Sequence, residues 1–134
     1  MTALAVFSHG AQAMFAELTD VQLIETSEII VVGTLVEQLE LQSPSGQLEV
    51  GRIEVETELK NVQNTQSVLL LLPQSIMPVA SDTITYAVGT KGLWFLRPLP
   101  NIGMDVHAAD HPQRFVPMSQ AKATTDMVRN LIGR

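Results

Sequence analysis

Alternating apolar and polar residues between positions 29 and 60 predict two long β-strands. In the first strand the odd positions from Ile29 to Leu41 are apolar or glycine, with Glu37 as the one exception. In the second, the apolar positions are even up to Val50 and odd from Ile53 onward. Because successive side chains of a strand point to opposite faces, this period of two predicts a hairpin with its turn at residues 43–46.

Two glycines interrupt these strands and predict where they bend. Gly33 has no side chain to pack in mid-strand, so it indicates a bulge or a sharp bend. The change of parity at Gly51 and Arg52 would turn the second strand inside out, so we expect a β-bulge there that accommodates one extra residue. Long strands bent in this way favour a small barrel over a flat sheet.

Shorter apolar segments supply the remaining strands. We expect a third strand from Ser67 to Leu72, a fourth from Leu93 to Leu96 and a closing strand from Arg114 to Met118, with an irregular connection over residues 97–112. The set predicts a mainly β fold, a five-stranded OB-like Greek-key barrel with a short N-terminal helix and a C-terminal helix.

Both helices have recognisable starts. Thr19 and Gln22 match the capping box, which predicts a helix from Asp20 to Thr26. Its apolar residues available to the core are Val21, Leu23 and Ile24. Ser119 is the expected N-cap of the second helix. Apolar residues then recur at helical spacing and predict its buried face: Ala123, Met127, Val128, Leu131 and Ile132.

The N-terminus resembles part of an export signal. Residues 1–13 hold a short apolar core and end in Ala11-Gln12-Ala13, the A-x-A form that signal peptidase favours. The positively charged region of a signal peptide is missing, which is explained if the assigned start codon lies inside a longer leader. The alternative is that these residues form an ordinary N-terminal helix. We expect residues 1–13 to be a signal-peptide remnant or extension and residues 14–134 to form one barrel domain. The predicted location is extracytoplasmic, periplasmic or secreted, with the cytoplasm as the alternative.

The charge balance argues against several partners. The net charge is −6, with eight Lys and Arg in 134 residues, so binding to nucleic acid or to anionic membrane surfaces is not expected. No apolar run approaches the roughly 20 residues of a membrane span, so no membrane insertion is expected. The second strand carries an alternating charged stripe, interpreted as a solvated outer face with cross-strand charge pairs: Arg52, Glu54, Glu56, Glu58 and Lys60.

The segment from Thr26 to Thr34, TSEIIVVGT, resembles the opening of netrin-like domains. These are OB-fold modules found in tissue inhibitors of metalloproteinases and in bacterial secreted proteins. Segments similar to later family motifs follow in order at residues 55–61, 68–73 and 88–96, and a C-terminal helix comes after them. The resemblance implies the fold. It does not imply protease inhibition, since the animal inhibitors ligate the protease zinc through an N-terminal Cys-x-Cys and this chain has no cysteine.

Candidate chemistry is confined to one loop. Asp105, His107, Asp110 and His111 are residue types that bind transition metals, but a surface loop rich in turn formers explains them without any function. No serine-nucleophile motif or phosphate-binding loop is present, so no catalytic residue and no cofactor is expected. Trp94 and Phe95 lie on opposite faces of their strand. One is expected in the core, and the other either contacts a partner or packs under the C-terminal helix.

Three functions remain open from the sequence. The favoured one is a non-enzymatic, exported OB-fold module that binds a protein or another envelope component through its barrel loops. The alternative is a metal-binding protein or metal-dependent enzyme that uses the Asp105–His111 loop. The third is a purely structural domain of a larger assembly.

Overall fold

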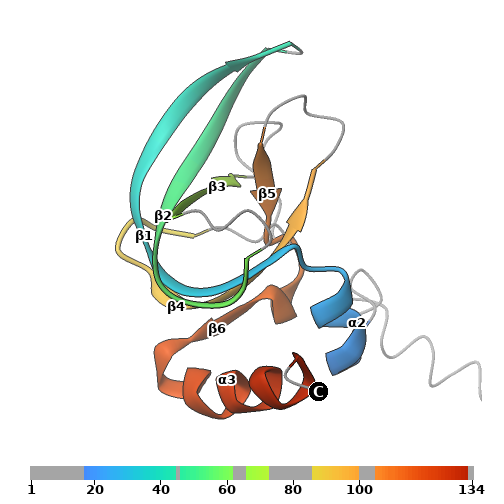
Figure 1. Cartoon of the computed structure of the whole chain (residues 1–134). Helices are drawn as coiled ribbons and strands as arrows, with labels where there is room; N and C mark the ends of the chain where they lie inside the picture. The colour runs from blue at the N-terminus through green and yellow to red at the C-terminus, as the bar shows by residue number, and fades with distance from the viewer. Residues whose placement is uncertain (1–16, 45, 62–65, 73–85, 100–104, 133–134) are drawn as a thin grey trace, which may run out of the picture.

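The computed structural model describes residues 17–44, 46–61, 66–72, 86–99 and 105–132. The elements run in the order α2 (Asp20–Glu25), β1 (Ile29–Ser43), β2 (Gly46–Asn61), β3 (Ser67–Leu71), β4 (Lys91–Pro98), β5 (Val106–Ala108), the 3-10 helix η4 (Pro112–Arg114), β6 (Phe115–Pro117) and α3 (Met118–Ile132). Figure 1 shows the strands curled round one another, with α2 and α3 together against one side of them. Residues 1–13 and the A-x-A site lie outside the described residues, so export stays a prediction.

Five strands close into a ring in the order β1, β2, β3, β5 and β4, with β4 pairing back onto β1. The β3–β5 pair is parallel and the other pairs are antiparallel. Each of these five strands thus has a paired neighbour on both sides. The structure therefore confirms the predicted mainly β, five-stranded OB-like barrel with a short helix before it and a longer helix at the C-terminus.

The strand that closes the ring is not the predicted one. The closing strand is β5, which lies inside the segment predicted to be an irregular connection. The predicted segment instead forms β6, which among the described strands pairs with β4 alone. β5 is three residues long with a histidine at its centre, so it lacks the apolar alternation by which strands are recognised in a sequence.

The bulge predicted at Gly51-Arg52 is wrong in its position. The β1–β2 ladder does shift opposite Arg52, but the extra residue is Val36 of β1. β2 pairs with β3 across Gly51 and Arg52 without any shift. The parity change in β2 instead separates two apolar clusters on its two faces, because Val50 belongs to one cluster and Ile53 to the other.

Close contacts with neighbouring strands explain both mid-strand glycines. A Cβ on Gly33 would lie 2.5 Å from the backbone oxygen of Glu54, and one on Gly51 would overlap the side chain of Leu35. The ladder also shifts at Gly33, as predicted, with the extra residue in the facing strand β2. The Trp94 indole nitrogen donates a hydrogen bond of 3.0 Å to the Gly33 carbonyl. The glycines thus allow the strands to coil tightly enough to close.

The core has an inner and an outer part. Trp94 lies inside the barrel, and Phe95 points to the other face and packs with the helices. Of the two alternatives for this strand, packing under the C-terminal helix is therefore correct. The barrel interior holds these buried residues: Ile29, Val31, Leu35, Ile53, Val68, Leu70, Leu72, Trp94, Leu96 and Ala109. The outer cluster under α2 and α3 holds Leu23, Ile24, Ile30, Leu93, Phe95, Ala121 and Val128.

The helix predictions are confirmed in outline and corrected in detail. The capping box at α2 is present, with the Gln22 amide donating to Thr19 Oγ1 at 3.0 Å and the Thr19 amide donating to Gln22 Oε1 at 2.9 Å. Val21 does not reach the core and is 50% exposed.

On α3, the helix begins at Met118, one residue before the expected cap Ser119. Ala121 and Val128 are its buried residues, whereas Ala123 is exposed. The spacing of apolar residues placed Ala123 on the buried face instead of Ala121. The sheet beneath the helix sets its orientation, and spacing alone does not contain that information.

Candidate functional site

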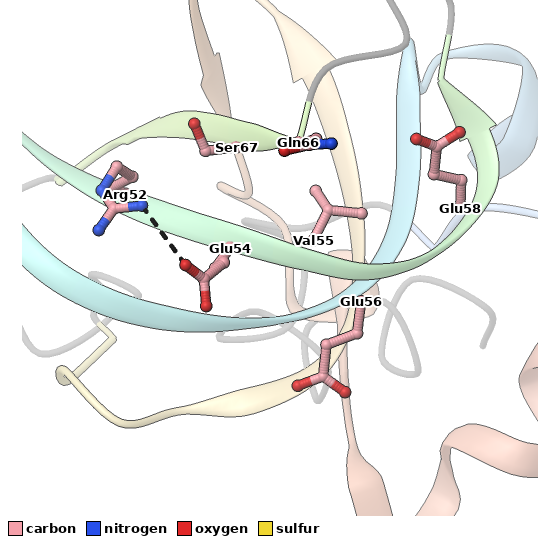
Figure 2. A pocket seen from close by; sticks show the side chains of 7 residues that line it. All are labelled: Arg52, Glu54, Val55, Glu56, Glu58, Gln66 and Ser67. Atoms are coloured by element: carbon pink, nitrogen blue, oxygen red, sulfur yellow. Dashed lines mark ion pairs between the residues drawn. The ribbon is translucent and has the colours of Figure 1, made fainter.

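An open groove of about 770 Å³ runs along β2 beside the start of β3 (Figure 2). We call it the β2 groove. It lies where β2 continues past the end of its pairing with β3, whose last partners are Glu54 and Ser67. The lining is mostly polar and consists of Arg52, Glu54, Val55, Glu56, Glu58, Gln66 and Ser67.

Irregular pairing of β2 shapes this groove. Gly33 pairs with Val55 while Val32 pairs with Thr57, so Glu56 is an extra residue in the ladder. Figure 2 shows Glu56 and Glu58 pointing away from each other. The predicted stripe of charges on a single face is therefore wrong, because a bulge reverses the alternation within it.

Cross-strand ion pairs neutralise part of the groove. Arg52 Nε lies 2.6 Å from Glu37 Oε2 on β1, and Lys91 Nζ on β4 lies 3.0 Å from Glu56 Oε1. Arg52 Nη1 is 3.9 Å from Glu54, a loose contact. These contacts confirm the predicted cross-strand charge pairing.

A surplus of negative charge remains in the groove. Glu58 forms no ion pair with any residue that the structure describes, and Glu54 has only its loose contact with Arg52.

The chemistry of the β2 groove suits binding better than catalysis. The Glu54 side chain is 65% exposed, whereas carboxylates that act as general acids depend on an apolar, buried setting. The described residues that line the groove do not include histidine, the commonest general base. The arrangement can hold cationic groups through ion pairs and hydrogen bonds, with the Gln66 amide and the Ser67 hydroxyl as further polar contacts.

A second, smaller pocket of about 250 Å³ lies beside β5 and is mostly apolar. Its lining is Leu71, Tyr86, Arg97, Leu99, Ala108, Ala109 and Asp110. The Tyr86 hydroxyl donates to the Ala109 carbonyl at 2.9 Å. Burial, together with the negative charge of Asp110, raises the pKa of Tyr86 to about 12, so the phenol stays protonated and remains a donor at neutral pH.

Asp110, one of the four metal candidates, is held by Arg97. The guanidinium donates from Nε to Oδ1 at 2.9 Å and from Nη2 to Oδ2 at 2.6 Å. This two-point hydrogen bond holds the pKa of the Asp110 carboxyl below its usual value. The Asp110 carboxylate is thereby engaged with an arginine.

His107 is buried in β5, with its side chain 3% exposed. Its Nε2 lies 2.6 Å from Glu28 Oε1, and its Nδ1 has no hydrogen-bond partner among the described residues. His111 occupies a different place, where its Nδ1 accepts a hydrogen bond of 3.1 Å from the Gln113 amide and caps η4. Asp105 is exposed just before β5.

The structure does not bring the four metal candidates together as a ligand set. Within the described ranges, no three His, Cys, Asp or Glu side chains are grouped so that they could hold a metal ion. The metal hypothesis thus gains no geometric support and stays a prediction.

Arg114 is a buried polar residue that the sequence did not reveal. It is 4% exposed and donates to Ser27 Oγ at 3.0 Å, to Thr26 Oγ1 at 2.9 Å and to the Phe95 carbonyl at 3.3 Å. Burial lowers its pKa. Glu28 contacts His107. The Thr26–Glu28 segment therefore binds two buried side chains, Arg114 and His107, that come from much later in the chain.

Fold and groove together define an OB-like barrel with an acidic groove on its β2 strand. Neither a scan of protein-family models nor a search of curated proteins finds a match to the chain. None of the helices that the structure describes is long and apolar enough to cross a membrane.

Proposed function

We propose that the protein is a non-enzymatic, exported interaction module that binds a partner protein by a basic segment seated in the β2 groove. The observation that carries the proposal is the position of the groove on the second and third strands. OB barrels present this face and the adjoining loops to their ligands. In this chain the face carries exposed carboxylates, which complement Lys and Arg.

The charges of the groove would act mainly on partner choice and association rate. Exposed ion pairs contribute about 0.2–1 kcal/mol each, so affinity has to come from the whole contact. Complementary charge accelerates encounter and excludes acidic competitors. Glu58, which has no ion pair within the described residues, and the loosely paired Glu54 are the groups that a basic partner would neutralise.

The netrin-like resemblance and export are parts of the same proposal. The order of the similar segments along the chain supports the family, and the Ala11-Gln12-Ala13 sequence supports cleavage. The N-terminal residue of the protein purified from its native cell tests export. A start at Met14 or Phe15 is expected, and an uncleaved Met1 in a cytoplasmic fraction would contradict it.

Site-directed photo-crosslinking in the native cell tests the partner. A crosslinking residue at Gln66, in the groove, is compared with one at Gln120, an exposed glutamine on α3. A protein captured from position 66 and not from position 120, through a Lys- or Arg-rich peptide, is expected. The double variant Glu54→Lys/Glu58→Lys should reduce that capture several-fold.

Two outcomes would overturn the proposal. Equal capture from both positions would mean that the groove has no special role. Capture of an envelope polysaccharide from position 66 would replace the protein partner by a different class of ligand.

A further inference from the structure

The β1–β2 hairpin extends beyond the barrel as an arm, formed by residues 36–43 of β1 and 46–49 of β2 (Figure 1). β4 pairs with β1 only as far as Thr34, and Leu35 then bonds to the backbone of Thr90 and Gly89. From Val36 onward, β1 pairs with β2 alone among the described residues. Within the described parts of the chain, the β1 side of the arm is therefore an unpaired edge, which we call the free β1 edge.

The hydrogen bonds show which backbone groups face that edge. The Glu49 carbonyl accepts from the Leu72 amide at 3.0 Å, on the side of β2 away from β1. In an antiparallel ladder, two residues directly opposite each other either exchange backbone hydrogen bonds or both point their N–H and C=O groups away from the partner strand. Glu40 is the partner of Glu49, so its N–H and C=O point to the free edge. Gln38 and Gln42 lie two residues to either side of Glu40. Because the direction of the backbone groups repeats every two residues along a strand, their N–H and C=O groups also point to the free edge.

The side chains along this edge are exposed and lack a positive charge. Gln38, Glu40 and Gln42 are all exposed on one face of the arm. Glu40 lies directly opposite Glu49, and like charges placed opposite each other destabilise a sheet. Glu40 accepts a hydrogen bond of 3.1 Å from the Gln47 amide group, but neither carboxylate forms an ion pair within the described part of the chain.

The opposite face of the arm is apolar. Leu39 and Leu41 are partly buried there against Leu48 and Val50. A strand added beside β1 would place alternate side chains next to these leucines and next to Glu40. The complementary sequence is therefore a Lys or Arg with an apolar residue on each side.

We propose that the free β1 edge binds an extended segment of a partner protein by strand addition, with a Lys or Arg opposite Glu40. Main-chain hydrogen bonds from Gln38, Glu40 and Gln42 supply the affinity, and the Glu40–Glu49 pair supplies the preference for a basic residue. The inference concerns a different surface from the β2 groove and does not depend on it.

A second copy of this chain is a poor occupant of the same edge. Antiparallel pairing of two copies centred on Glu40 would place the two Glu40 side chains opposite each other, beside both Glu49 carboxylates. Concentrating four like charges in this way opposes edge-to-edge association. The arm is thus protected from self-pairing by the feature that selects a basic partner.

The test uses the blocked peptide Thr-Gln-Val-Lys-Val-Gln-Thr added to the whole protein, with amide hydrogen exchange followed by NMR. The amides of Gln38, Glu40 and Gln42 should exchange about ten-fold more slowly when the peptide concentration is about ten times its Kd. The same peptide N-methylated at the Gln, Lys and Gln positions, which keeps the charge but removes the donors, should give no protection.

Two variants and a control separate backbone pairing from charge. Glu40→Lys should raise the Kd about five-fold or more, while Glu25→Lys, the same change at an exposed site on α2, should leave it within about two-fold. Gln42→Pro keeps every charge but removes one outward N–H, and it should also weaken binding.

Three results would overturn the inference. They are equal effects of the methylated and unmethylated peptides, no saturable protection at about 1 mM peptide, and protection that rises with protein concentration alone. The last result would make a second copy the occupant. Because the β2 groove is unaltered in these variants, failure here is distinguishable from failure of the groove proposal.

Discussion

The connection from α2 to β1 and the middle of β2 both carry polar side chains, but the fold uses them in opposite ways. At Thr26–Glu28 the polar atoms point inward and bind Arg114 and His107, which are almost fully buried. In the β2 groove, Glu54 and Glu58 project into solvent, with little or no compensation from cationic neighbours. The first region stabilises the barrel, and the second remains available to a partner.

The difference follows from the energetics of polar groups. A buried donor or acceptor that loses its partner keeps its full desolvation penalty, about 1–3 kcal/mol and more for charged groups. An exposed group simply returns to water, so its loss is nearly neutral. Substitutions in the two regions should therefore separate stability from binding.

The largest loss of stability is expected for Arg114→Ala. The change removes the hydrogen bonds to Ser27, Thr26 and the Phe95 carbonyl and leaves an empty space. It should lower the free energy of unfolding by about 3 kcal/mol, measured by urea denaturation. Arg129→Ala, on the exposed side of α3, is the matched control and should change stability by less than about 0.5 kcal/mol. Equal effects would show that Arg114 is not a structural anchor.

His107→Ala should have the next largest effect and lower the free energy of unfolding by about 2 kcal/mol. It breaks the contact with Glu28 and opens a cavity in β5, the short strand that closes the barrel. Thermal unfolding checks it, with His111→Ala in the half-buried cap of η4 as control, expected to cost about 1 kcal/mol or less. If His107→Ala left the stability almost unchanged, the buried contact of His107 with Glu28 would not contribute to holding the barrel together.

Alkaline pH should weaken the fold through Tyr86. Its pKa is about 12 in the folded protein and about 10 when unfolded. The raised value means that the stabilising contribution is complete below about pH 10 and is lost as the pH rises toward 12, since the unfolded chain then binds fewer protons. The effect should be roughly 1–2 kcal/mol after allowance for partial exposure.

Tyr86 is the only tyrosine, so tyrosinate absorbance reports it alone. A titration midpoint near the ordinary value of 10 in the folded protein would contradict this prediction. Tyr86→Phe should abolish the absorbance change and flatten the alkaline limb of the stability curve.

The smallest effect on stability should come from the β2 groove. Glu58→Gln should alter the free energy of unfolding by less than about 0.5 kcal/mol, while reducing crosslinking of a partner from position 66. Glu17→Gln, another exposed glutamate, is the control and should alter neither. If Glu58→Gln destabilised the barrel by more than about 1 kcal/mol, the contrast between the two regions would not hold.

The two regions also differ in how far they could be predicted. The groove carboxylates were visible as a polar run on β2, but Gln66 and Ser67 join them only because β3 starts beside Glu54. Nothing in the sequence indicated that Arg114 and His107 are buried, since their partners at residues 26–28 are about eighty positions away in the chain. A polar residue in a sequence does not show whether its partner is water or a distant side chain.

The sequence by itself determined the local features of this protein. Alternation of period two identified β1 and β2, and the Thr19–Gln22 pattern identified the capping box of α2. These features depend on neighbouring residues and on the geometry of a single strand or helical turn. They were sufficient for the barrel class, because two long strands interrupted by glycines have few other ways to bury their apolar faces.

Only the tertiary structure decided the rest. It assigned the extra residue to Val36 instead of Gly51-Arg52 and closed the ring with β5 instead of residues 114–118. Among the described strands, it also left one edge of the arm unpaired. A bulge belongs to a pair of strands, and either strand can supply the extra residue for the same parity change. Closure and free edges likewise depend on which distant strand arrives alongside, which no local pattern encodes.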